Sequence, residues 1–273
     1  MSTNDSNVTR VGIAGLGTVG KTIARTLAAG IPGVRLTAVS ARDVEKAQAW
    51  LDGQGIDVPV VAIGELEPHC DVVVECAPSA LMRELAEPVL KAGKKLVVLS
   101  SGALLDRLDL IELARLHSAQ ILVPTGALLG LDAVKAAAEG RIEKVTMVSR
   151  KPVEGFRGAP FLVKHGIDIE GIVEPKRIFS GKAREAATGF PANLNVAISL
   201  SLAGIGPDLT DLEIWADPTI ERNTHTIIVD SDSARFSMTI ENIPTENPKT
   251  GRITAQSVIA LLRGLSAPLK VGT

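Results

Sequence analysis

The sequence contains no tyrosine, and phenylalanine and tryptophan are scarce, so that aromatic residues make up 3% of its 273 residues. A chain with so few aromatic side chains offers few platforms on which nucleic-acid bases could stack. Basic residues are not in excess either, because the net charge is −2, and a polyanion would find no broad positive surface. We therefore expect no nucleic acid among the partners of this protein.

Cysteines and long apolar runs are also scarce. The two cysteines, Cys70 and Cys76, lie beside an apolar strand-like run, which indicates a reducing compartment rather than a disulfide framework. No uninterrupted apolar stretch approaches the length that spans a bilayer, and residues 1–10 are polar without the apolar core of a secretion signal. These absences predict a cytoplasmic protein without a membrane partner.

The strongest positive signal is the glycine pattern Gly15-x-Gly17-x-x-Gly20, which follows an apolar strand-like run and precedes a helical one. In dinucleotide-binding proteins the first glycine allows the tight turn, the second lets the backbone approach the pyrophosphate, and the third lets the helix pack closely on the sheet. The N–H groups at the start of the helix then meet the phosphates, which adds Thr18 and Val19 to the expected cofactor site. Glycines at this spacing also occur as ordinary turn residues, but the flanking strand and helix favour cofactor binding.

Strand-like and helix-like patterns alternate through the first half of the chain. The expected strands are residues 10–14, 35–40, 71–75, 95–99 and 120–123, and the expected helices are residues 21–29, 44–51, 80–92 and 104–118. Short apolar strands separated by helices predict a parallel sheet covered on both faces, with its ligand at the carboxyl ends of the strands. The expected fold class is α/β, with a doubly wound Rossmann-type domain over residues 1–133.

Beyond about residue 140 the pattern changes to that of an α+β domain with a mixed or antiparallel sheet, assigned to residues 134–273 for catalysis and oligomerisation. The expected strands are 144–149, 174–180, 212–216, 226–229 and 235–240, and the expected helices are 191–203 and about 254–265. The last helix is a candidate to pack back on the first domain. An open sheet in the second domain would need cover, so we expect a homodimer or a higher homo-oligomer.

The acidic residue that normally binds the ribose hydroxyls of NAD is missing from its expected place. The second strand ends in Ser40 and Ala41, followed by Arg42 and Asp43, where a carboxylate would be typical. Arg42 could pair with the 2′-phosphate of NADP. Alternatively, Arg42 is a solvated loop residue and Asp43 caps the next helix. The cofactor is therefore expected to be NAD or NADP, with use of NADP or of both favoured.

Seven segments occur in the order and at the distances typical of one enzyme family. They are residues 12–20, 125–132, 149–152, 181–187, 190–197, 216–218 and 222–225. Together they resemble the L-aspartate dehydrogenases, which carry a Rossmann domain followed by a mixed catalytic domain. The resemblance implies that His225 is catalytic and that Ala127 and Asn195 bind the nicotinamide cofactor. Thr125 stands where the family commonly has serine.

Aspartate oxidation moves a hydride from Cα to the nicotinamide and leaves an imine, which water attacks to release ammonia. A histidine suits the accompanying proton transfers because its unperturbed pKa of about 6.5 lies near neutral pH. The dicarboxylate substrate needs cationic or amide donors, for which Arg150, Lys151 and Asn193 are the candidates. Each of these three could equally be an ordinary polar surface residue. No residue is assigned to a metal.

The sequence leaves three alternatives to this function open. An aldehyde dehydrogenase that forms acyl phosphates would need a cysteine nucleophile, for which Cys76 is the candidate. A reductase of the homoserine dehydrogenase or dihydrodipicolinate reductase type would share the architecture. A sensor that binds NAD(P)H without turnover would share the cofactor site but would not need His225.

Overall fold

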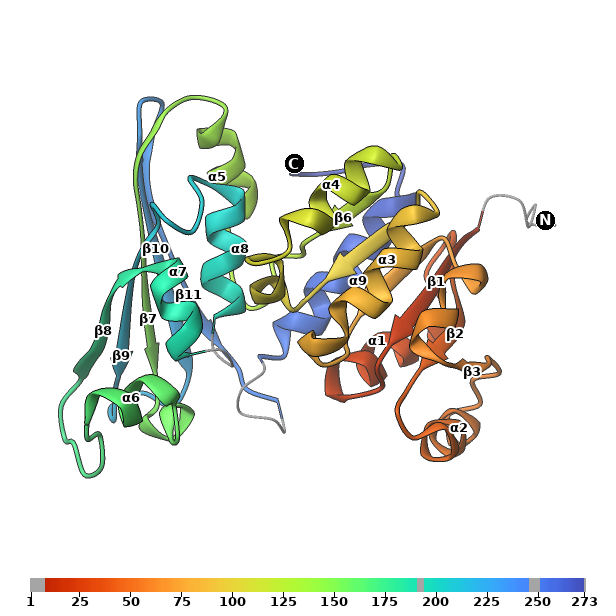
Figure 1. Ribbon diagram of the computed structural model, residues 1–273, viewed down its shortest axis with the longest axis horizontal. Coiled ribbons are helices and arrows are strands. Elements are labelled where there is room, and N and C mark those ends of the chain that lie inside the picture. The colour runs from red at the N-terminus through yellow and green to blue at the C-terminus, as the bar shows by residue number, and fades with distance from the viewer. Residues whose placement is uncertain (1–7, 191–193, 246–250, 273) are drawn as a thin grey trace. The chain divides into compact units, whose positions relative to one another are not determined.

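The computed structural model describes residues 8–190, 194–245 and 251–272 (Figure 1). Contacts divide the chain into two compact units: residues up to Pro124 together with Ala255–Val271, and Thr125–Thr254 together with Gly272. The expected boundary after residue 133 falls inside helix α5 (Leu131–Ala138). Contacts assign this whole helix to the second unit, where it packs against helix α8 (Asn195–Ala203).

The first unit is built on a parallel sheet with the strand order β3-β2-β1-β4-β5-β6. The strands are β1 (Thr9–Ala14), β2 (Val34–Ser40), β3 (Val60–Val61), β4 (Val72–Glu75), β5 (Lys95–Val98) and β6 (Gln120–Leu122). This order confirms the predicted doubly wound sheet, whose ligands bind where the order reverses, next to β1. The two-residue strand β3 was not predicted, because two residues are too few to show an alternating pattern.

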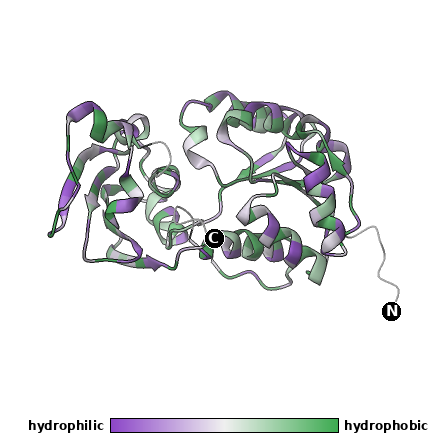
Figure 2. Ribbon diagram, turned by 90° about the horizontal axis from the view of Figure 1, so that it is seen from below, coloured by the Kyte–Doolittle hydropathy of each residue, from purple (hydrophilic) through white to green (hydrophobic). Residues whose placement is uncertain are grey.

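Helices cover both faces of this sheet. They are α1 (Thr18–Ala29), α2 (Val44–Gly53), α3 (Met82–Lys91), α4 (Leu108–Leu116) and α9 (Ile253–Ser266). Successive residues of a strand face opposite sides, so Val72 and Val74 belong to one buried cluster and Val73 belongs to another. Figure 2 shows that hydrophobic and hydrophilic residues are mixed along the helices, as expected for helices with one buried face.

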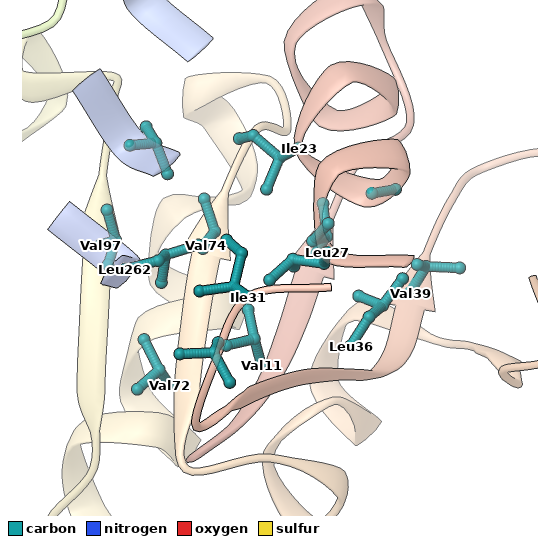
Figure 3. Close-up of a cluster of buried hydrophobic side chains, with 14 of the residues drawn as sticks. Val11, Ile23, Leu27, Ile31, Leu36, Val39, Val72, Val74, Val97 and Leu262 are labelled. Carbon is teal, nitrogen blue, oxygen red and sulfur yellow. The ribbon is translucent and has the colours of Figure 1, made fainter. Parts of the chain in front are cut away.

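The cluster on one face of the sheet joins segments from both ends of the chain. Ile23 and Leu27 of α1 and Leu262 of α9 pack with Val11 and Val74 of the central strands (Figure 3). The other cluster is formed with α3 and α4. Short 3-10 helices at Ile63–Glu65, Glu67–His69, Ser79–Leu81 and Ser101–Leu104 complete the connections of the first unit. The 3-10 helix Ser101–Leu104 occupies the start of the helix predicted over residues 104–118, so α4 begins only at Leu108.

The second unit contains a mixed sheet with the strand order β11-β10-β7-β9-β8. The strands are β7 (Ile142–Lys151), β8 (Lys176–Lys182), β9 (Asp211–Ala216), β10 (Asn223–Ser231) and β11 (Arg235–Asn242). Strands β7 and β9 pair in parallel, and the other neighbouring pairs are antiparallel. The predicted hairpin of the last two strands is present and turns before Arg235.

Helices α5, α6 (Pro160–His165), α7 (Ala183–Gly189) and α8 gather over one face of this sheet (Figure 1). A short 3-10 helix at Val153–Phe156 follows β7. Helix α8 begins at Asn195, and the first three residues of the predicted helix 191–203 lie outside the described residues. None of the described helices is long and apolar enough to cross a membrane.

Candidate functional site

The loop between β1 and α1 has the shape that a dinucleotide pyrophosphate requires. Gly15 has φ +101°, a conformation that favours glycine, and a Cβ there would lie 2.5 Å from the carbonyl oxygen of Cys76. A Cβ at Gly20 would overlap the carbonyl oxygen of Gly15. By contrast, a Cβ at Gly17 would meet no heavy atom within 4 Å. The fold therefore requires Gly15 and Gly20, whereas the bare backbone at Gly17 leaves space for a ligand.

The start of α1 completes this loop. Thr18 and Val19 are the first two residues of the helix, no described side chain caps it at Gly17, and no acidic residue occupies its first turn. The first N–H groups of a helix have no partners inside the helix and carry a partial positive charge. This helix start therefore suits a phosphate.

An open groove of about 720 Å³ runs from this loop across the end of β2. It is lined by Gly15, Leu16, Gly17, Lys21, Ser40, Ala41, Arg42, Asp43, Lys46, Ala47, Trp50, Ile63, Ala77, Pro78, Leu81 and Glu84. Trp50 forms one apolar wall, and the Lys21 ammonium lies 5.2 Å from the centre of its ring. All of these residues belong to the first unit.

Arg42 and Asp43 have different roles at the end of β2. The Asp43 carboxylate accepts a hydrogen bond of 3.0 Å from the backbone N–H of Lys46 and caps α2, as one of the two interpretations predicted. The exposed Arg42 guanidinium makes no hydrogen bond or ion pair with any described residue. With Lys46 it brings two positive charges to this end of the groove. Lys46 was not predicted, although its place in the first turn of the helix expected over residues 44–51 follows from the sequence.

A buried carboxylate holds the ends of β4 and β5 together. Glu75 accepts hydrogen bonds from the backbone N–H of Leu99 at 3.1 Å and from the N–H and hydroxyl of Ser100 at 2.8 and 3.0 Å. Burial raises the pKa of Glu75. Burial and the Glu75 charge also raise the pKa of the neighbouring Cys76, so this thiol is a poor nucleophile. This environment argues against the alternative in which Cys76 attacks an aldehyde.

In the second unit, His225 is buried on the helix-covered face of the sheet. It is 3% exposed and lies on β10, directly opposite Ser149 of β7. The hydroxyl oxygen of Ser149 lies 3.1 Å from Nδ1 of His225. Burial, and then the positive charge of Lys151, lower the pKa of His225 from about 6.5 to about 3. The imidazole is therefore neutral at neutral pH.

Lys151 shares this face of β7 because it stands two residues after Ser149. Its side chain is 6% exposed, and its ammonium lies 6.0 Å from the centre of the Phe156 ring. Ser149 and Lys151 line a small cavity of the second unit. Its other lining residues are apolar: Met147, Phe156, Leu194, Val196, Ala197, Leu212 and Ile214. A buried ammonium can hold an anion by a charge-assisted hydrogen bond.

Arg150 lies on the opposite face of the same strand. Its guanidinium stacks on Trp215 of β9 at 4.6 Å from the ring centre and forms an ion pair of 3.4 Å with Asp217. The Asp217 carboxylate also accepts hydrogen bonds from the N–H and hydroxyl of Thr219, at 2.9 and 2.6 Å. The structure thus brings Lys151, but not Arg150, to the side of the sheet that carries His225.

Two further residues that are predicted to bind the cofactor, Ala127 and Asn195, belong to the second unit. The carbonyl oxygen of Ala127 accepts a hydrogen bond of 2.9 Å from the side-chain amide of Asn242, which fixes the loop before α5. Asn195 is the first residue of α8. The third substrate candidate, Asn193, lies outside the described residues. The role of Asn242 was not predicted, because its partner is far away in the sequence.

Replacing Gly17 by valine should block the pyrophosphate without disturbing the protein, because a side chain there points into open space. We expect an increase of at least about tenfold in the dissociation constant of NAD(P)H, or about 1.4 kcal/mol, measured by fluorescence titration. Gly264→Val is the matched control, since a Cβ at this glycine of α9 also meets nothing within 4 Å. A folded Gly17→Val protein with unchanged affinity would place the dinucleotide elsewhere.

Comparisons with known proteins find matches for both units of the chain. Residues 15–124 match the family described as the NAD-binding domain of homoserine dehydrogenase, and residues 132–265 match the C-terminal domain of aspartate dehydrogenase. The L-aspartate dehydrogenase 3 of Bordetella bronchiseptica is 61% identical over 96% of this chain and 97% of its own. The L-aspartate dehydrogenase of Bradyrhizobium diazoefficiens is 58% identical over 98% and 95% of the two chains.

A solved structure shares the whole fold. The aspartate dehydrogenase of Thermotoga maritima has a TM-score of 0.73 to this chain at 24% identity and covers 97% of this chain and 99% of its own. This likeness concerns the architecture, whereas the two bacterial relatives are similar in sequence from end to end. The chain therefore belongs to the aspartate dehydrogenase family.

Proposed function

We propose that this chain is an NAD(P)-dependent L-aspartate dehydrogenase, which interconverts L-aspartate with oxaloacetate and ammonia. The observation that carries the proposal is the burial of a neutral histidine, His225, next to a buried cation, Lys151, on one face of the second sheet. Family membership supplies the reaction class. These two residues supply the two functions that an amino dicarboxylate requires, proton transfer and binding of an anion.

The groove of the first unit fits a dinucleotide, because the bare backbone at Gly17 faces open space at the start of a helix. A bound nicotinamide cofactor would supply the hydride acceptor for the oxidation at Cα of aspartate. The residues that would hold the cofactor are Gly15, Gly17, Thr18, Val19, Gly20, Arg42, Ala127 and Asn195.

His225 transfers the protons in this proposal. Its neutral imidazole takes a proton from the substrate ammonium, which leaves the nitrogen lone pair that stabilises the imine as the hydride departs. After that proton has passed to solvent, the neutral imidazole takes a proton from the water that attacks the imine carbon and gives it to the nitrogen, which leaves as ammonia. In the reverse direction the same group donates these protons. A histidine that is already neutral can accept a proton without first losing one.

Lys151 binds one carboxylate of the substrate. A charge-assisted hydrogen bond from a buried ammonium to a carboxylate is stronger than one in water, because few water molecules compete for either group. A carboxylate at Lys151 would also offset the positive charge that contributes to the low pKa of His225. The substrate would thereby make the imidazole a better base. Arg150 remains a second candidate from the sequence, but its contacts with Trp215 and Asp217 favour a role in holding the loop after β9.

The proposed role of His225 is tested by replacing it with alanine. We expect a loss of about 10²- to 10⁴-fold in kcat, both with aspartate and with oxaloacetate plus ammonia, because the acid/base group is gone. Affinity for NADPH should stay within a few fold. His117→Ala, an exposed histidine at the end of α4, is the matched control. If His225→Ala keeps more than about a tenth of the turnover, the histidine is structural and the proposed mechanism is wrong.

The carboxylate-binding role of Lys151 is tested by Lys151→Met, which keeps the length of the side chain and removes its charge. We expect the KM for aspartate to rise about 10- to 100-fold, since a hydrogen bond to a charged group contributes about 1.5–3 kcal/mol. Lys144→Met on the same strand is the control, because Lys144 is largely exposed. Arg150→Met separates the two candidates: a rise in KM for this variant alone would assign the substrate to the other face of β7.

Arg42 and the absent ribose-binding acid favour NADP or dual use of the two cofactors. Arg42→Ala should lower the affinity for NADPH about tenfold or more, because the guanidinium would pair with the 2′-phosphate. The affinity for NADH should change little. The measurement is kcat/KM for both cofactors in both proteins. A strict preference for NAD that is the same in the wild type and in Arg42→Ala would exclude this role.

A further inference from the structure

The contact between Ser149 and His225 is built by the backbone ladder. The two residues stand directly opposite each other on the antiparallel strands β7 and β10, and both are at least nine-tenths buried. The Ser149 hydroxyl lies 3.1 Å from Nδ1 of the imidazole. Among the described residues, no hydrogen bond reaches the other ring nitrogen, Nε2. In the part of the chain that the structure describes, the Ser149 hydroxyl is therefore the only hydrogen-bond partner of the His225 ring.

A neutral imidazole has one nitrogen that carries a hydrogen and one that carries a lone pair. A serine hydroxyl can donate or accept, so the contact at Nδ1 is compatible with either form of the ring. If the hydroxyl donates, Nε2 carries the hydrogen and cannot take up a proton. If the hydroxyl accepts from the Nδ1–H group, Nε2 keeps its lone pair and can act as a base.

We propose that Ser149 is a positioning residue that accepts a hydrogen bond from Nδ1–H of His225 and so holds the imidazole in the form whose Nε2 is basic. This inference rests on the proposed catalytic role of His225. The proton that leaves the substrate nitrogen joins Nε2, while the Nδ1–H bond to Ser149 is unchanged. The ring therefore gains and returns its proton without turning or exchanging hydrogens on the Ser149 side.

Among the described residues that line the cavity, no other side chain than that of Ser149 offers an acceptor for an Nδ1–H group. The Lys151 ammonium, on the same face of β7, has donors but no acceptor, so it cannot bind an Nδ1–H group. The other residues that line the cavity at Ser149 are apolar, among them Leu194 and Ala197 of the α8 region. Without the hydroxyl, Nδ1–H would be buried without a partner, which is costly, and the ring would be free to adopt the other form.

The experiment measures the ring directly by NMR on protein labelled with ¹⁵N-histidine, which gives spectra of only four histidines. Two-bond ¹⁵N–¹H correlations identify the nitrogen that carries the hydrogen, and the His225→Ala spectrum assigns the signal. In the wild type we expect Nδ1 protonated and Nε2 with a lone pair. In Ser149→Ala we expect a shift toward the Nε2–H form, whereas Ser149→Thr, which keeps a hydroxyl, should retain the wild-type form.

Kinetics give a second, independent readout on the same variants. Ser149→Ala should lower kcat about tenfold, within the range expected for one hydrogen bond at a buried group, and leave the KM for aspartate within about threefold. Ser149→Thr should restore most of kcat. A purely structural role would change stability and KM without changing the form of the ring.

The outcomes separate this inference from the function on which it rests. A wild-type ring with hydrogen on Nε2 overturns the inference, even if no Ser149 variant folds. A ring that stays in the Nδ1–H form in folded Ser149→Ala also overturns it. If His225→Ala remains active, the proposed function fails instead, and the measured form of the ring is unaffected by that result.

Discussion

The register between β7 and β10 is the constraint on which the candidate catalytic cluster depends. It places His225 opposite Ser149 and, two residues along, Ile227 opposite Met147. Ile227 and Met147 are completely buried, so the apolar side chains of this face fix the register. A slip of β10 by one residue would turn His225 to the other face of the sheet, away from Ser149 and Lys151. The same packing that stabilises the sheet therefore positions the imidazole.

The first unit depends on a different constraint, the close approach of backbone segments in the glycine loop. Gly15 and Gly20 have no room for a Cβ because carbonyl oxygens of the chain itself stand in the way. Gly17 has room, and its bare backbone faces a groove. One motif thus contains two glycines that the fold needs and a third, Gly17, at which the fold would tolerate a Cβ. Of these two kinds of position, only the second bears on function, and it could be recognised only from the groove that Gly17 lines.

The sequence predicted those features that depend on neighbouring residues. Apolar runs indicated the main strands of the first sheet, and the helix predicted over residues 21–29 after the glycine pattern is α1, Thr18–Ala29. Alternation along β7 could also have separated Arg150 from Lys151, because adjacent residues of a strand face opposite sides. The pairing of Ser149 with His225 joins residues 76 positions apart, and no local pattern specifies which residues of two strands will face each other. This pair could be found only from the register between β7 and β10 in the structure.

An uncharged partner for His225 has a consequence for Lys151. An acidic residue at position 149 would also hold the ring in one form, but it would stabilise the imidazolium and raise the pKa of His225. It would lie two residues from Lys151 on the same face of β7 and would attract the ammonium that we assign to the substrate carboxylate. A serine hydroxyl fixes the ring without adding a negative charge. The neutral imidazole and the buried cation can therefore coexist on one sheet face, each with the charge that its proposed role requires.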